Sequence, residues 1–321
     1  MCTAVRFNAS DGGMFMGRNL DWGCGYGQKP RVVPAGFPVT YRFMDDAPAA
    51  HAAIGMCVDF QNYPMFFDCG NDAGLAVAGL NFPGFAAYAD APVGGKKNVC
   101  AFEFPLWIAA TFASVDEVEA ALANTVIVGE SAGEGLGVSY LHWIVGDASR
   151  SIVVESRADG LHVVDDPVDV LANQPSIEWH LENLRSYVTV TNDFPEPSQW
   201  RSAKLVPYAA GAGMRGIPGD SYSPSRFVKA AYLNASYPEK DSEKDNVIRM
   251  FRTLEGVAMV EGAARMGDGT FERTLYTSCF AANSGRYYWS TYEDPAIRYV
   301  SLADAAGAPI DKLYVPEPRL R

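Results

Sequence analysis

The sequence predicts an α+β fold, because strand-like runs follow one another as antiparallel hairpins and helix candidates come in groups between them. A clear hairpin joins residues 151–154 to residues 161–164 across a turn at residues 158–160. A doubly wound parallel sheet would instead alternate strands and helices one by one. The sequence contains no low-complexity tract, long charged run or internal repeat, so we interpret residues 1–321 as one domain.

The strand candidates are short runs rich in β-branched and apolar residues, at 52–58, 75–80, 142–145, 151–155, 160–164 and 287–289. The helix candidates are residues 105–112, 115–123, 177–187, 225–233 and 245–255. Ser114, with Glu117 three residues later, predicts a capping box at the start of the second helix. Pro224 suits the first turn of the fourth helix, because proline lacks only an N–H that a helix start does not use.

Composition narrows the class of protein. The chain has 321 residues, of which 48% are hydrophobic and 20% charged, as in ordinary globular proteins with a large core. Its net charge of −12 and its lack of basic clusters make nucleic acid an unsuitable partner. The six cysteines show no CxxC spacing, and no secretory signal or long apolar run is present. We therefore expect a cytoplasmic protein with reduced thiols.

The start of the chain carries the strongest chemical signal. Cys2 follows Met1 directly, so removal of Met1 gives one residue both a thiol and a free α-amine. An α-amine has an ordinary pKa of about 7.7 to 8.0, which lets it act as a base near neutral pH. A nucleophilic cysteine needs such a base to become a thiolate.

The next twenty residues predict a hairpin that brings two charged residues toward Cys2. Strands at residues 2–7 and 14–20 flank a cluster of turn formers, so Cys2 lies roughly opposite Leu20. Arg18 is then a diagonal neighbour at about 7–8 Å, and its charge would favour the thiolate. Asp21 could hold the α-amine. In the alternative, this is an edge hairpin with both charges solvated, and a register slip of one residue would turn Arg18 away.

Two motif matches are unconvincing in their context. Residues 211–216 fit GxGxxG, but no clear strand precedes them, and Pro218 prevents the helix that should receive a phosphate. Residues 129–133 fit GxSxG around Ser131, but residues 134–137 are too rich in glycine to begin the required helix. A mobile surface loop is the better interpretation of the second match.

A papain-like pairing of Cys2 with a histidine stays open. No sequence context marks any of the four histidines as a base, and His142, between Leu141 and Trp143, looks like a core residue. Helical spacing for zinc, such as HExxH, does not occur.

Taken together, these features resemble the choloylglycine hydrolase family, which contains bile salt hydrolases and penicillin V acylases among the N-terminal nucleophile hydrolases. The resemblance runs through nearly the whole chain, and the joint order of its landmarks is highly specific although each is weak alone. The landmarks are MCT at 1–3, GRNLD at 17–21, GL at 74–75, AGLNFP at 78–83, LHW at 141–143, VLANQP at 170–175, GIPGD at 216–220, SPSRF at 223–227 and YTSC at 276–279.

The resemblance implies an αββα sandwich, in which two antiparallel sheets lie between helical layers. It implies hydrolysis of the amide that links a bile acid to glycine or taurine, a homotetramer, and a mechanism without cofactor or metal. The implied catalytic residues are Cys2 as nucleophile and base, Arg18 and Asp21 beside it, Asn81 and Asn173 at the oxyanion, and Arg226. Judged from the residues alone, the two asparagines are more simply turn residues, because each precedes a proline closely.

Residues on three variable loops, 22–28, 59–66 and 129–140, are expected to frame the substrate. The candidate substrate contacts are Leu20, Trp22, Tyr26, Phe60, Phe66, Leu136 and Tyr140. The last loop is glycine-rich, and Ala172 replaces a threonine that many members carry, so the preferred bile acid is open.

Asn81 favours bile salts over penicillin V, since penicillin V acylases tend to carry tyrosine there. Three alternatives remain at this point. They are a penicillin V acylase or related N-acyl amide hydrolase, with or without acyl transfer to an amine; a serine hydrolase that uses Ser131; and a sterol- or lipid-binding module without activity.

Overall fold

A computed structural model describes residues 1–60 and 63–321 and contains two seven-stranded antiparallel sheets. The first sheet has the order β14 (Val170–Leu171), β1 (Cys2–Asn8), β2 (Met14–Trp22), β17 (Arg273–Ala281), β18 (Arg286–Thr291), β19 (Arg298–Ser301) and β20 (Arg319–Leu320). The second has the order β13 (Gly160–Asp165), β12 (Ser151–Arg157), β11 (Leu141–Gly146), β8 (Ala76–Asn81), β7 (Tyr63–Asn71), β6 (Ala53–Phe60) and β3 (Lys29–Val33).

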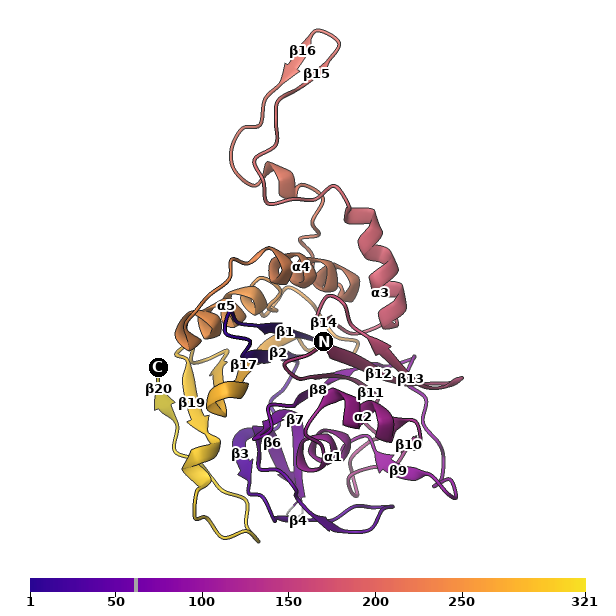
Figure 1. The fold of residues 1–321 in the computed structure, drawn as a ribbon. Coiled ribbons are helices and arrows are strands. Elements are labelled where there is room, and N and C mark those ends of the chain that lie inside the picture. The colour runs from indigo at the N-terminus through magenta and orange to yellow at the C-terminus, as the bar shows by residue number, and fades with distance from the viewer. Residues whose placement is uncertain (61–62) are drawn as a thin grey trace.

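The sheets lie face to face between helical layers (Figure 1). Helices α4 (Ser223–Ser236) and α5 (Glu243–Glu255) cover the first sheet, with α3 (Ile177–Asn183) beside α4. Helices α1 (Phe104–Thr111) and α2 (Val115–Leu122) lie on the far side of the second sheet. The expected αββα sandwich is thus confirmed, and every helix and strand candidate lies within a few residues of an observed element.

Shorter elements complete the described chain. The two-stranded pairs are β4 (Pro38–Val39) with β5 (Ala47–Pro48), β9 (Lys97–Cys100) with β10 (Thr125–Val128), and β15 (Ser198–Trp200) with β16 (Ala203–Leu205). At α2, the Ser114 hydroxyl accepts the Glu117 N–H at 3.3 Å, as predicted. The Glu117 carboxylate accepts the N–H of Ala113 at 2.8 Å, one residue earlier than in a capping box.

Two apolar cores hold the layers together. One core lies between the sheets and extends beneath α4 and α5, with Ala4 of β1, Leu80 of β8 and Phe227 of α4 among its members. The other lies between the second sheet and α1, where Phe104 stacks on Trp143 with ring centroids 4.2 Å apart. Because β1 and β2 are sandwiched between the second sheet and helices, their polar side chains must find partners inside the protein.

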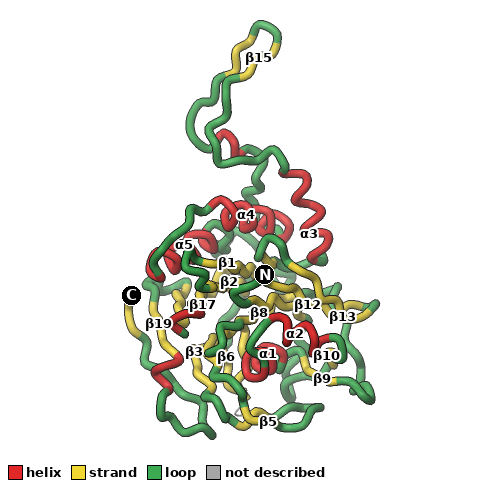
Figure 2. Tube along the Cα trace, in the orientation of Figure 1, coloured by secondary structure: helices red, strands yellow, loops and turns green. Residues whose placement is uncertain are grey.

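One arm leaves this body between α3 and α4. It carries the hairpin β15–β16, which projects well beyond the layers, and its path is mostly loop (Figures 1 and 2). The GxGxxG match lies here, with a 3-10 turn over Ala212–Met214 where a nucleotide-binding protein needs a helix. In the described part of the chain, no helix is long and apolar enough to cross a membrane.

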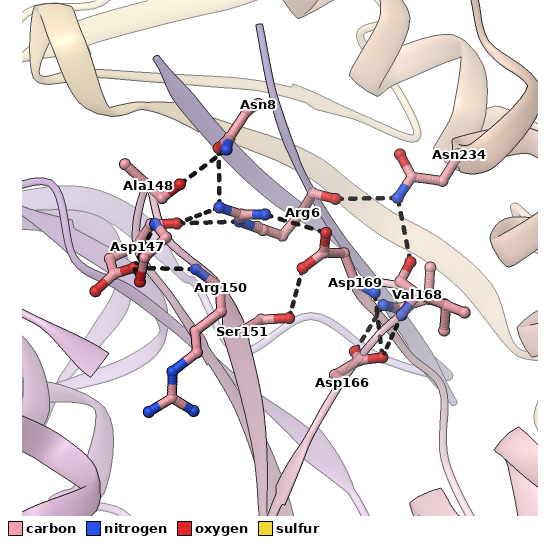
Figure 3. A network of polar contacts seen from close by, with 12 residues as sticks. Arg6, Asn8, Asp147, Ala148, Arg150, Ser151, Asp166, Val168, Asp169 and Asn234 are labelled. Atoms are coloured by element: carbon pink, nitrogen blue, oxygen red, sulfur yellow. Dashed lines mark hydrogen bonds and ion pairs between the residues drawn. The ribbon is translucent and has the colours of Figure 1, made fainter. Parts of the chain in front are cut away.

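A buried polar network ties β1 to the loop before β14 (Figure 3). Arg6 donates to the carbonyl of Asp147 and, at 3.1 Å, to the carboxylate of Asp169. The Asp166 carboxylate accepts three backbone N–H groups, from Val168 and Asp169 at 3.1 Å each and from Val170 at 2.8 Å. This loop leads into β14, so the network fixes the strand that pairs with β1.

Asp166→Ala removes one acceptor for three N–H groups in a buried loop. We expect the free energy of unfolding to fall by about 3 kcal/mol, since buried donors left without acceptors are costly. Urea denaturation followed by circular dichroism measures this loss. Asp165→Ala is the matched control, because Asp165 is exposed and pairs with Arg150 at the surface; it should cost less than about 1 kcal/mol. Equal losses in the two variants would contradict the assignment.

Candidate active site

The first two strands form the predicted hairpin around Cys2. Cys2 pairs with Leu20 and Ala4 pairs with Arg18, in the register that the sequence predicts. The turn between the strands closes with a hydrogen bond from the Gly12 N–H to the Ala9 carbonyl at 2.9 Å. The alternative of a solvated edge hairpin is wrong, because β1 lies between β14 and β2 inside the first sheet.

Arg18 contacts the Cys2 sulfur directly. Its Nη2 lies 2.6 Å from Cys2 Sγ, and its Nη1 donates to the Gly79 carbonyl at 2.7 Å. Burial lowers the pKa of Arg18, but interaction with Cys2, Tyr276 and Asp68 more than offsets this and raises it. A permanently charged guanidinium at this distance stabilises a thiolate.

Gly17 explains how β2 can lie so close to β17 and α5. A Cβ placed on Gly17 would lie 2.1 Å from the Ser278 carbonyl oxygen and 2.9 Å from the Met250 side chain. Only glycine permits β2, β17 and α5 to pack so tightly here. The backbone that carries Arg18 is therefore held from both sides.

Asn173 and Arg226 form a second cluster at the Cys2 backbone. Asn173 Oδ1 accepts the Cys2 N–H at 2.7 Å and an Arg226 Nη2 hydrogen at 2.7 Å. Arg226 Nη1 also donates to the Cys2 carbonyl and to the Thr3 hydroxyl at 2.5 Å. The Asn173 amide donates to the Asn81 carbonyl at 2.7 Å, so residues from β1, β8, α4 and the segment after β14 meet at one point.

Only one oxygen of the buried Asp21 carboxylate has a hydrogen-bond partner among the described residues. Its Oδ1 accepts from the Thr274 hydroxyl at 2.6 Å, whereas its buried Oδ2 has no partner among the described residues. Burial raises the pKa of Asp21, and the positive charges of Arg226 and the N-terminus oppose that rise. Its backbone carbonyl accepts the Met1 ammonium group at 2.6 Å. Asp21 therefore contacts Met1 through its backbone, and its carboxylate keeps acceptor capacity to spare.

Two buried histidines hold the segment that carries Asn173, a role that the sequence did not predict. Nε2 of His142 bonds to the Ala172 carbonyl and Nε2 of His180 bonds to the Asn173 carbonyl, each at 2.9 Å. Each ring stacks on a phenylalanine, His142 on Phe82 and His180 on Phe227. His142 is thus a core residue as expected. Both Nε2 atoms are occupied by carbonyls, which disfavours a papain-like pair with Cys2.

Asp68 is a further residue that sequence reasoning missed. It is buried and accepts hydroxyl hydrogens from Tyr276 at 2.5 Å, Tyr287 at 2.7 Å and Ser278 at 2.8 Å. Ser278 Oγ in turn accepts the Arg18 N–H at 3.3 Å. Asp68 supplies negative charge near the buried guanidinium of Arg18, which burial alone would destabilise.

The candidate substrate contacts fall into two groups. Tyr26 and Tyr140 are each 47% exposed and Leu136 is 43% exposed, while Trp22 and Phe60 are half-buried. Leu20 is buried in the core between the sheets, and Phe66 is buried in the core against α1, so neither side chain is displayed on the surface.

The neighbouring Phe67, which the sequence analysis did not name, contacts both Arg18 and Tyr26. Its carbonyl accepts from Arg18 Nη1 at 3.3 Å, and its ring centroid is 5.8 Å from that of Tyr26. The region expected as a loop at 59–66 consists of the ends of β6 and β7, with residues 61 and 62 outside the described part.

The glycine-rich loop 129–140 reaches over the end of β6. A Cβ on Gly133 would lie 2.3 Å from the Phe60 ring, so the loop backbone packs directly on that side chain. Ser131 Oγ bonds to the carbonyls of Gly133 and Leu136 at 2.8 and 2.7 Å. Ser131 therefore holds its own loop and sits on no strand-to-helix turn, which disfavours it as a nucleophile. Among the described residues, no group of three or more His, Cys, Asp or Glu could hold a metal ion.

Comparison with known proteins agrees with this geometry. A family model described as linear amide C–N hydrolases, choloylglycine hydrolase family, matches residues 2–306. A bile salt hydrolase/transferase of Bifidobacterium longum subsp. longum is 52% identical over 305 residues, covering 95% of this chain and 96% of that protein.

Solved structures agree as well. The C2A mutant of the conjugated bile acid hydrolase from Clostridium perfringens superposes with a TM-score of 0.89 at 32% identity, covering 100% of this chain and 96% of that chain. Penicillin V acylase from Agrobacterium tumefaciens shares the fold, with a TM-score of 0.76 at 17% identity, covering 94% and 86% of the two chains.

Burial lowers the pKa of His180 from 6.5 to about 4. The free energy of unfolding should therefore depend on pH through this histidine. The unfolded chain takes up a proton as pH falls below 6.5, whereas the folded chain resists it until about pH 4. Stability from this group is therefore complete above pH 6.5 and is lost between these two values. In His180→Gln, the difference in unfolding free energy from wild type should change by about 2 kcal/mol between pH 7 and pH 5.

Urea denaturation at the two pH values measures this change. His162→Gln is the control, because that partly exposed histidine pairs with Asp159 at the surface. Parallel pH dependences of wild type and His180→Gln would contradict the prediction.

Proposed function

The chain belongs to the choloylglycine hydrolase family of linear amide C–N hydrolases, and we propose that it cleaves the amide bond of glycine- or taurine-conjugated bile acids. The observation that carries the proposal is the contact of Arg18 with the Cys2 sulfur, beside an amide cluster on Asn173 and Asn81. The printed activities of the Bifidobacterium and Clostridium relatives support the substrate class.

Cleavage of the Met1–Cys2 bond is the first requirement, because Cys2 N is an amide in the unprocessed chain. Once free, this nitrogen is a base attached to the nucleophilic residue itself. It takes the thiol proton, and the resulting thiolate is stabilised by Arg18 at 2.6 Å. Oδ2 of Asp21, which has no partner among the described residues, is suited to hold the ammonium that forms.

Attack of Sγ on the substrate carbonyl gives a tetrahedral oxyanion. The Asn173 amide has two N–H groups and uses one on the Asn81 carbonyl, which leaves a donor for this oxyanion. A backbone N–H from Asn81 would be the second donor. One such donor is typically worth about 2.7–4 kcal/mol in the transition state.

Collapse of the oxyanion breaks the C–N bond. The Cys2 ammonium gives its proton to the leaving nitrogen, and glycine or taurine departs while the acyl group remains on Sγ as a thioester. Water then attacks the thioester, and the same amine takes the proton from water and returns one to sulfur. Arg226 supports both steps by holding the Cys2 carbonyl and Asn173 Oδ1 in place.

The acyl half of the substrate requires an apolar surface near this centre. Trp22, Tyr26 and Phe67 lie on the β2 and β7 side, and Leu136 and Tyr140 lie on the loop that reaches over Phe60. Large aromatic and aliphatic side chains suit the flat apolar face of a sterol. An amine in place of water would take the acyl group from the thioester, and the Bifidobacterium relative is described as a transferase as well.

Cys2→Ala should abolish release of glycine and taurine, because it removes the nucleophile. The measurement is the amine released from a panel of conjugated bile acids with penicillin V alongside, after intact mass has shown that Met1 is absent. Cys24→Ala removes the exposed cysteine of the loop 22–28 but not the proposed nucleophile, so this variant should still release glycine and taurine.

Three outcomes would contradict the proposal. Activity that survives Cys2→Ala but not Ser131→Ala would indicate a serine hydrolase. Penicillin V cleaved in preference to every conjugate would indicate an acylase of the other class. Bile acid bound by wild type with no amine released would indicate a binding module.

We further infer a homotetramer in which copies of the chain contact one another through the arm between α3 and α4. The arm places large apolar side chains in solvent, with Val188 85%, Trp200 74% and Tyr208 106% exposed. Such a surface is costly on a free monomer and suits a contact between copies.

A reducing compartment such as the cytoplasm suits the six free cysteines.

Trp200→Asp together with Tyr208→Asp should shift the assembly to smaller species, because charge on the arm opposes burial in a partner. Light scattering coupled to size-exclusion chromatography gives the mass. Val260→Asp, at a position 64% exposed on the body, is the control and should leave the mass unchanged. A monomeric wild-type protein, or a tetramer that persists in the arm variant, would overturn the inference.

A further inference from the structure

Glu272 has a position that the mechanism above does not use. It lies immediately before β17, is 6% exposed, and its Oε1 is 2.7 Å from the Met1 nitrogen. Among the described residues, the Glu272 side chain accepts a hydrogen bond from this ammonium group. The same ammonium donates to the Asp21 carbonyl at 2.6 Å, on the strand that carries Arg18.

Cleavage of the Met1–Cys2 bond removes that partner and creates a new cation close by. A buried carboxylate without a positive or hydrogen-bonding partner is strongly disfavoured. Three covalent bonds separate the Met1 nitrogen from the Cys2 nitrogen, so Glu272 Oε1 lies within about 7 Å of the new α-amine. Once Met1 has left, the new α-amine, whose N–H is bonded to Asn173 Oδ1 in the unprocessed chain, is a cation that this carboxylate can approach.

We propose that Glu272 is a positioning residue for catalysis, which binds the protonated α-amine of mature Cys2 and thereby sets how readily this amine acts as base. The inference rests on the proposed function. It assigns Asp21 and Glu272 to one ammonium-binding site, with one carboxylate from β2 and one from the segment before β17.

The surrounding charges determine the direction in which Glu272 shifts the pKa of the Cys2 α-amine. The titratable and charged groups around Cys2 are its own thiol on β1, Arg18 and Asp21 on β2, Tyr26 after β2, Arg226 on α4, Tyr276 on β17 and Glu272 itself, with Asp68 on β7 beside Arg18. The two arginines disfavour an ammonium and the carboxylates favour it. Removing the charge of Glu272 therefore makes the amine lose its proton at lower pH.

Glu272→Gln tests this, because glutamine keeps the shape and loses the charge. The acid limb of kcat/KM for a conjugated bile acid should move to lower pH by about 1 unit. Glu272→Asp keeps the charge with a shorter reach, and should move the limb less in the same direction. Glu261→Gln is the matched control, since Glu261 pairs with Arg273 on the surface and should leave the profile unchanged.

A second measurement does not depend on the substrate. The rate of Cys2 alkylation by iodoacetamide, followed by intact mass against pH, should show the same shift in Glu272→Gln and no shift in Glu261→Gln. Intact mass also shows whether each protein starts at Cys2, and circular dichroism shows whether it is folded.

The outcomes separate this inference from the proposed function. Superimposable alkylation and activity profiles of wild type and Glu272→Gln would overturn the role of Glu272 while leaving bile salt hydrolysis intact. A wild type that cleaves no conjugate would overturn the proposed function, and the alkylation profiles would still decide the role of Glu272. If Glu272→Gln fails to fold, an unshifted alkylation profile in Glu272→Asp would count against the inference.

Discussion

The structure depends on two buried guanidinium groups that hold the ends of Cys2. Arg18 is 0% exposed and contacts the sulfur, while Arg226 is 1% exposed and contacts the carbonyl. Two positive charges inside a protein are costly unless carboxylates and carbonyls surround them. Asp21, Asp68 and Glu272 supply the negative charge, and each comes from a different segment of the chain. The charge balance thus requires that both sheets and α4 come together.

The architecture meets this requirement with rigid elements. β1 lies between β14 and β2 in the first sheet, and the second sheet brings β7 and β8 against its inner face. The segment after β14 is fixed at two successive carbonyls by His142 and His180, so Asn173 has little freedom to move. Preorganised donors cost no rearrangement when charge develops on the substrate, which is why a site of this kind is built on the core.

Much of the local structure could be predicted from the sequence, because it depends on neighbours in the chain. The β1–β2 register follows from a short turn and two apolar strands, and Cys2 does lie opposite Leu20. Asn173 and Arg226 lie 171 and 224 residues from Cys2, and nothing local distinguishes them from turn and helix residues. Only the resemblance to a family pointed to them.

The supporting residues were missed for a physical reason. Asp68, Glu272 and His180 have roles that follow from burial and from partners on distant strands, which periodicity and motif spacing do not encode. The burial of Phe66 shows the same limit, since side chains alternate along a strand and the sequence alone did not indicate which face of β7 Phe66 occupies. The register of β6 and β7 shifts at Met56 and Cys57, which makes that face harder to infer from pattern alone.

The proposed catalytic residues and the proposed substrate contacts differ in their burial. Cys2, Arg18, Asn173 and Arg226 are each no more than 3% exposed, so a change in any of them disturbs packing as well as chemistry. Tyr26, Leu136 and Tyr140 are more than 40% exposed and contribute little to the core. Under the proposed function, substitutions at these exposed positions would alter the apolar face offered to the acyl group and leave the core unchanged. The proposed function therefore allows the preferred steroid to vary while the proposed cysteine chemistry stays fixed.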